Sequence, residues 1–230
     1  GLPLSIKGGE LFITDLAVSR DDLQPASDKA RIEASWGELV YQSLTSRGGE
    51  LEGELTHQGW QLGKLALPLD QGNLAASGFW SRDPASPNRL SLSGKELDIS
   101  KLAPFWKPAE RLSGTLNLQA ELQSQTDGAL WWKDLSGTAR LDGKDLFING
   151  IKLDDYLEQS LETAAHSLTT ESLNTALQGG DTAINLLALE LKAKAGTITM
   201  NGAASTIPHQ IGLKGSLILG QQAPLSAQWQ

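Results

Sequence analysis

Several features are scarce in this 230-residue chain, which has no cysteine, one methionine and two tyrosines. Without cysteine there are no disulfides, no thiolate metal ligands and no cysteine nucleophile. No apolar run approaches the roughly 18 residues of a transmembrane helix. Lys and Arg total 19 against 27 Asp and Glu, and they are not clustered. Since nucleic-acid binding needs a concentrated basic face, we expect no nucleic-acid partner.

The residues that usually carry chemistry are also sparse. His57, His166 and His209 are the only histidines, and no two of them have metal-ligand spacing. The nucleophile elbow, the dinucleotide fingerprint and the phosphate-binding lysine loop are all missing. The adjacent carboxylates Asp154 and Asp155 fit the start of a helix better than an acid–base pair. We therefore expect a non-enzymatic protein without cofactor, metal site or catalytic residues.

Alternation of apolar and polar residues is the main positive signal. From Leu112 to Gln123 apolar residues and glycine occupy one face, and polar residues occupy the other. The same period of two recurs around Leu135–Leu141 and Ile211–Leu219, and in shorter stretches before residue 95. Successive side chains of a strand point to opposite sides of a sheet, so this pattern predicts half-buried strands.

Turn signals separate these segments, among them Gly48-Gly49, Asp70-Gln71-Gly72, Asp142-Gly143 and Asn149-Gly150. Their spacing predicts about a dozen short strands. The expected fold is mainly β: a long curved antiparallel sheet, groove-like or sandwich-like. We expect residues 1–230 to form a single elongated domain.

A helical segment is predicted near 154–179, where the apolar period changes from two to that of a helix. Leu157, Leu161 and Leu168 share one stripe, and Gly179-Gly180 would end the segment. The simplest role for this stripe is to close one end of the β core. It could also occupy the space that a ligand would need.

Tryptophan is unusually frequent, with seven copies against two tyrosines. Several occur in aromatic pairs, such as Phe79-Trp80 and Trp131-Trp132. On a strand, one ring of such a pair points into the core and the other points outward. An outward ring suits a lipid tail, a carbohydrate or a membrane interface, whereas the simpler alternative is packing beneath a loop.

The stretch from Leu135 to Asp154 resembles the C-terminal region of the AsmA family, which are bacterial inner-membrane-anchored proteins facing the periplasm. The resemblance rests on Gly137, Gly143, Gly150, Ile151 and Leu153, followed by the predicted helix. The segments Arg47–Gly53 and Leu112–Leu118 are similar to strand openings of that family. The resemblance covers roughly residues 40 to 220, and its motifs are structural, so it implies no catalytic residues.

The resemblance implies a periplasmic segment of a longer protein that is anchored to the inner membrane outside this sequence. It also implies an apolar β groove that binds or conducts phospholipid or another acyl lipid, contributing to outer-membrane biogenesis. Acyl chains suit such a surface because their burial is non-directional and needs no polar constellation. The candidate groove residues, chosen by alternation, are Leu116, Leu118, Leu122, Leu141, Ile148, Leu217 and Leu219.

Two alternatives stay open at this point. The first is a structural or assembly module for outer-membrane protein biogenesis or secretion, which would contact envelope proteins through strand edges without lipid. The second, less favoured, is a glycan hydrolase with carboxylates distant in the sequence.

Overall fold

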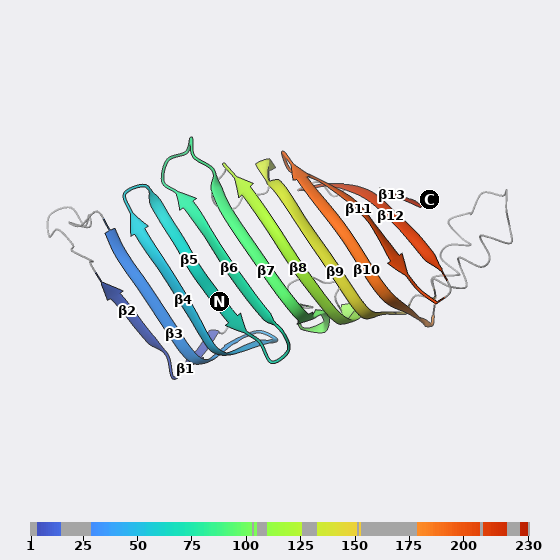
Figure 1. Cartoon of the computed structure of the whole chain (residues 1–230), viewed down its shortest axis with the longest axis horizontal. Coiled ribbons are helices and arrows are strands. Elements are labelled where there is room, and N and C mark those ends of the chain that lie inside the picture. Colours follow the sequence, from blue (N-terminus) through green and yellow to red (C-terminus); the bar gives the residue numbers. More distant parts are fainter. Residues whose placement is uncertain are drawn as a thin grey trace.

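The computed structural model describes residues 4–14, 29–102, 104, 110–125, 133–150, 152, 179–207, 209–219 and 226–229. Thirteen strands form one antiparallel sheet, and from β3 onward each strand pairs with its neighbours in the chain (Figure 1). At the first edge, β1 and β2 both pair with β3. The strands are β1 (Leu4–Lys7), β2 (Glu10–Thr14), β3 (Lys29–Tyr41), β4 (Leu44–Thr56), β5 (Gly59–Pro68), β6 (Asn73–Ser81), β7 (Asn88–Asp98), β8 (Leu112–Ser124), β9 (Ser136–Asn149), β10 (Asp181–Lys194), β11 (Thr197–Ser205), β12 (Gln210–Ile218) and β13 (Ser226–Trp229).

The predicted fold class is confirmed: the chain is mainly β, in one open antiparallel sheet. The strands are longer than predicted, and β9 and β10 have 14 residues each. The predicted helical segment at 154–179 lies outside the described residues except for Gly179, which is in a bend before β10. Among the described residues, no helix is long and apolar enough to cross a membrane.

Two of the predicted turns are wrong, because Gly48-Gly49 lies inside β4 and Asp142-Gly143 lies inside β9. Gly49 and Gly143 face the apolar side of the sheet, and each leaves room for a large neighbouring side chain. A Cβ on Gly49 would lie 2.3 Å from the Trp36 ring, and a Cβ on Gly143 would lie 2.5 Å from Leu146 Cδ1. Glycine here marks a close approach within the sheet and not a change of direction.

A β-bulge occurs twice at the same four-residue motif, Gly-Lys-acidic-Leu, at Gly94–Leu97 in β7 and Gly143–Leu146 in β9. The register against β8 shifts by one residue at each motif. The acidic residue has positive φ, 53° at Glu96 and 50° at Asp145. The extra residue turns the leucine onto the same face as the glycine, so Leu97 and Leu146 fold over the glycine that precedes them.

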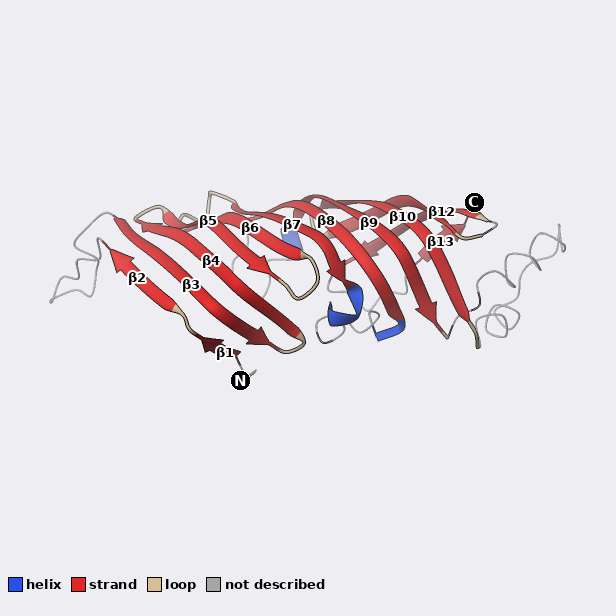
Figure 2. Cartoon of the chain, turned by 60° about the horizontal axis from the view of Figure 1, so that its bottom comes forward, coloured by secondary structure: helices blue, strands red, loops and turns tan. Residues whose placement is uncertain are grey.

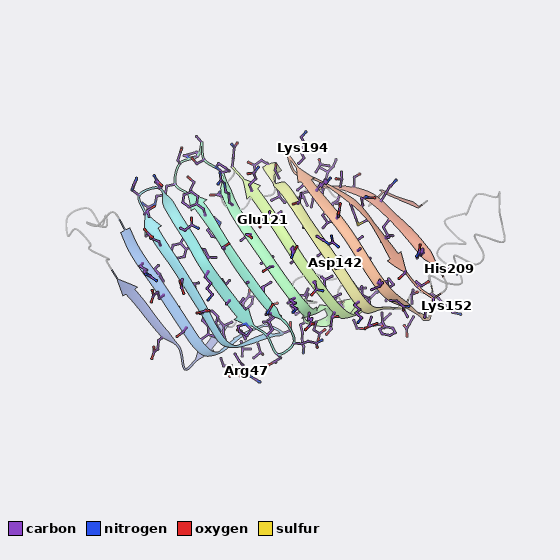
Figure 3. All side chains as sticks on the ribbon, in the orientation of Figure 1. Arg47, Glu121, Asp142, Lys152, Lys194 and His209 are labelled. Atoms are coloured by element: carbon purple, nitrogen blue, oxygen red, sulfur yellow. The ribbon has the colours of Figure 1, made fainter. Side chains whose placement is uncertain are left out.

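The two ends of the strands differ in how they are covered. We call the ends of β8 at Ser124 and β10 at Lys194 the upper margin, and the opposite ends, near Lys152, the lower margin (Figure 3). The 3₁₀-helix η1 (Ile99–Leu102) follows β7 at the lower margin and lies beneath the arched sheet (Figure 2). Its Ile99 packs in a buried cluster with Leu146, Ile184 and Ala204.

Substituting Gly143→Ala should lower the free energy of unfolding by about 1–3 kcal/mol, because the new methyl group collides with the buried Leu146. Gly63→Ala is the matched control, since Gly63 is exposed and its nearest atom to a new Cβ is 3.6 Å away. There we expect no loss, or a gain of up to about 1 kcal/mol from the stiffer unfolded chain. Urea unfolding of both variants measures the difference. Equal losses would contradict the role assigned to Gly143.

Candidate functional site

The apolar side chains of the sheet form continuous rows that run perpendicular to the strands. The rows follow from the pairing registers, in which each apolar residue lies opposite another apolar residue or glycine. The first row, nearest the upper margin, is Ile32, Gly53, Leu62, Gly78, Leu90, Leu122, Gly137, Ala193, Ile198 and Leu217. The second row is Ala34, Leu51, Leu65, Ala76, Leu92, Ala120, Ala139, Leu191, Met200 and Gly215. The third row is Leu67, Leu74, Gly94, Leu118, Leu141, Leu189, Gly202 and Leu213.

No charged side chain interrupts these rows, and the charges of the strands lie on the opposite face. Between the second and third rows, that polar face carries Gln119, Arg140, Glu190, Asn201 and Lys214 in register. The sheet therefore has one apolar face and one polar face over at least β3 to β12. Such separation follows from a strict period of two when every register is kept.

Several charges on the polar face are paired with each other. Arg140 donates two hydrogen bonds to Asp142, at 2.7 and 3.0 Å, and this raises the pKa of Arg140 above its ordinary value. Lys64 donates to Glu50, which likewise raises the pKa of Lys64. All four side chains are substantially exposed, so these pairs add little stability.

A hollow of about 480 Å³ lies on the polar face across β7 to β10. Its walls include Ser91 and Glu121, which are hydrogen-bonded to each other at 2.6 Å, together with Arg140 and Glu190. Among the described residues, no group of three His, Asp or Glu side chains is placed to hold a metal ion. Glu121 and Arg140 in this hollow already have partners, and the apolar face is far more extensive, so the apolar face is the stronger candidate site.

The lower part of the apolar face is a packed core. Leu146 is 4% exposed, and Ile99, Ile184 and Ala204 around it are also buried. The predicted groove residues Leu116 and Ile148 pack against this cluster and are half-buried. They lie on the predicted face, but at the filled end of it.

The upper part of the face is different, because most of its leucines, unlike Leu62, are only half-buried by the described residues. Four of the predicted groove residues lie in the rows here: Leu122 and Leu217 in the first row, Leu118 and Leu141 in the third. Leu118 and Leu141 are direct cross-strand partners. Leu219 lies at the upper margin, where its backbone N–H donates to Gly196 at 2.8 Å. The structure thus places six of the seven predicted residues on one face, with Leu219 in the turn after β12, and their contact with lipid stays a prediction.

The predicted groove residues do not include the part of this face formed by β3 to β6, where the sequence shows alternation only in shorter stretches. Three tryptophans belong to it: Trp36, which is buried and donates a hydrogen bond to Ser46, and Trp60 and Trp80, which are cross-strand partners. The sequence signal for it is the alternation of apolar and polar residues before and after Gly63-Lys64. A register shift in β5 at this point moves the apolar positions from even to odd residue numbers. Trp80 has its predicted partner Phe79 on the opposite face, whereas Phe105-Trp106 and Trp131-Trp132 lie outside the described residues.

Leu146→Ala should destabilise the protein by about 2–4 kcal/mol, because it opens a cavity in the packed lower cluster. Leu122→Ala removes the same atoms from a half-buried position in the upper part, and we expect a loss of about 1 kcal/mol or less. Urea unfolding of the delipidated proteins measures both changes. Equal, large losses would mean that the upper part of the face is filled as well.

A family model described as the AsmA family matches residues 14–203. No curated protein and no solved structure is similar enough to this chain to count as a match. The family match spans most of the 230 residues and covers β3 to β10 completely. The chain belongs to the AsmA family.

Proposed function

We propose that the upper part of the apolar face binds the acyl chains of phospholipid or a similar lipid, and that the protein acts by binding and not by catalysis. The observation that carries this proposal is the set of three uninterrupted apolar rows, which are free of charge and in which most side chains are only partly buried by the described residues. The first two rows run from β3 to β12, and the third runs from β5 to β12. Contiguous apolar surface of this extent is rare on soluble proteins unless it contacts something.

An acyl chain is a suitable occupant for physical reasons. Rows on one face are separated by two residues, or about 6.7 Å, so the three rows span roughly 13 Å. This strip offers continuous apolar contact and no hydrogen-bonding groups apart from the paired backbone. Burial of each methylene contributes about 0.8 kcal/mol and needs no directional partner. A polar ligand would find nothing on this strip to replace its hydrogen bonds with water.

Membership of the AsmA family supports an envelope-associated function. The finer statements belong to the proposal: the domain works in the periplasm, as a segment of a protein anchored to the inner membrane. There it would hold or conduct lipid along the rows and so contribute to outer-membrane biogenesis. Conduction suits rows that cross many strands, because the apolar contact is similar at each strand along them.

Leu118→Glu should abolish lipid binding, because it places a charge at the centre of the third row beside Leu141. Gln119→Glu is the matched control: it adds the same charge at the adjacent residue, which faces the polar side. The measurement is native mass spectrometry of the purified proteins, with extraction and quantification of bound phospholipid. We expect bound lipid in the unchanged protein and in Gln119→Glu, and at least a tenfold loss in Leu118→Glu.

Circular dichroism of the same samples checks that Leu118→Glu is folded. A folded variant that keeps its lipid would contradict the proposal, as would an unchanged protein that carries no lipid and acquires none from phospholipid vesicles. If Leu118→Glu unfolds, the test moves to Leu217→Glu with Ser216→Glu as its control, near the free end of β12.

One observation favours the alternative of an assembly module acting through strand edges. The edge strand β13 pairs with β12 only over Leu213–Ser216, four of the nine residues of β12. An edge of this kind could accept a strand from a partner protein. The alternative predicts that a cross-linker placed at Gln210 captures an envelope protein even when Leu118→Glu has removed the lipid.

A further inference from the structure

We propose that lipid on the apolar face has one orientation: the ends of its acyl chains point toward η1, and its glycerol and ester groups lie beside Trp60 and Trp80. This inference rests on the proposed function and adds a direction to it. Two independent features of the sheet carry it, a tryptophan pair at the upper margin and a packed cluster at the lower margin.

The tryptophan pair lies directly above the first row. Trp60 and Trp80 are cross-strand partners, two residues beyond Leu62 and Gly78, which are themselves paired in the first row. The six-membered ring of Trp60 covers Gly53, and that of Trp80 approaches Gly78. Both rings therefore turn their apolar edge toward the rows. Trp80 stays 39% exposed.

The indole N–H groups are placed differently from that of the buried Trp36. Trp36 is 7% exposed and donates to Ser46 at 3.3 Å. Within the part of the chain that the structure describes, neither Trp60 nor Trp80 donates such a bond. An indole with an apolar edge on hydrocarbon and a donor at the polar side is the arrangement found at membrane–water interfaces, level with the lipid ester and headgroup region.

Among the described residues, the packed cluster at the lower margin offers a polar headgroup no comparable place. There the face ends in the cluster of Ile99, Leu146, Ile184 and Ala204, each of them buried. Leu102 of η1 packs on this cluster as well. A headgroup pushed against it would lose its hydration without gaining hydrogen bonds. The ends of acyl chains meet no such penalty.

The distance between the two features fits a lipid. On β7, Leu90 pairs with Gly78 below Trp80, and η1 begins at Ile99 directly after the same strand. The seven residue steps from Leu90 to Leu97 span roughly 23 Å. Half of a bilayer's hydrocarbon core is about 15 Å deep. An acyl chain lying along β7 with its ester groups at the tryptophan pair therefore extends over most of the distance to the lower cluster.

The test uses two photoreactive phosphatidylcholines with the unmodified protein. One carries a diazirine at the end of its acyl chain, and the other carries it in the headgroup. After loading and irradiation, peptide mass spectrometry locates the adducts. We expect the chain-end probe to label peptides containing Leu97–Leu102 or Leu112–Leu118. The headgroup probe should label peptides containing Gly59–Leu62 or Gly78–Arg82, with at least a fivefold preference in each case.

The outcomes separate the two proposals. Absence of adducts and of bound lipid with both probes contradicts the proposed function itself. Adducts distributed alike for the two probes, or in the reverse order, overturn the orientation while leaving lipid binding intact. A Trp60→Ala/Trp80→Ala double variant should lose the headgroup preference at Gly59–Leu62 and retain lipid. Phe79→Ala, on the opposite face beside Trp80, should leave the labelling pattern unchanged.

Discussion

The separation of this sheet into an apolar and a polar face depends on the pairing register of its strands. With a side-chain period of two, a slip of one residue in any strand would move its leucines to the polar face and its charges onto the apolar one. The rows from Ile32 to Leu217 exist because ten consecutive strands keep their registers together. The bulges at Gly94–Leu97 and Gly143–Leu146 obey the same constraint. Each bulge inserts one residue, and the apolar residue of the sequence is also displaced by one position. Leu97 and Leu146 therefore still lie on the apolar side.

Much of this could be predicted from the sequence, because alternation is local. The mainly β fold, the single antiparallel sheet and the shared face of Leu118, Leu141 and Leu217 all follow from the period of two. Strand lengths could not be predicted in the same way. Gly49 and Gly143 resemble turn glycines until one knows that Trp36 and Leu146 lie over them, and those contacts depend on folding. The division of the face into a filled lower part and a half-exposed upper part is also tertiary, since it arises where η1 packs against Leu146 and Ile184.

A one-layer sheet needs both of its faces to be compatible with their surroundings. The polar face achieves this with short and charged side chains, some joined in exposed ion pairs such as Arg140 with Asp142. The apolar face changes in character from the lower margin to the upper margin. Buried aliphatic residues fill the lower end, half-buried leucines form the rows, and tryptophans stand at the upper margin. In the orientation proposed above, this gradient would let the apolar face distinguish the two ends of a lipid.

The order of the strands has a consequence for size. Within the part of the chain that the structure describes, each strand from β4 to β12 pairs with the strands before and after it in the chain, so this part of the sheet is a linear array of hairpins. Stability in such arrays is close to a sum of unit and nearest-neighbour contributions. One added hairpin lengthens the rows by about 9.6 Å, and it does so without altering any distant contact. Gain or loss of whole hairpins is thus a route by which evolution can adjust the reach of such a sheet in discrete steps.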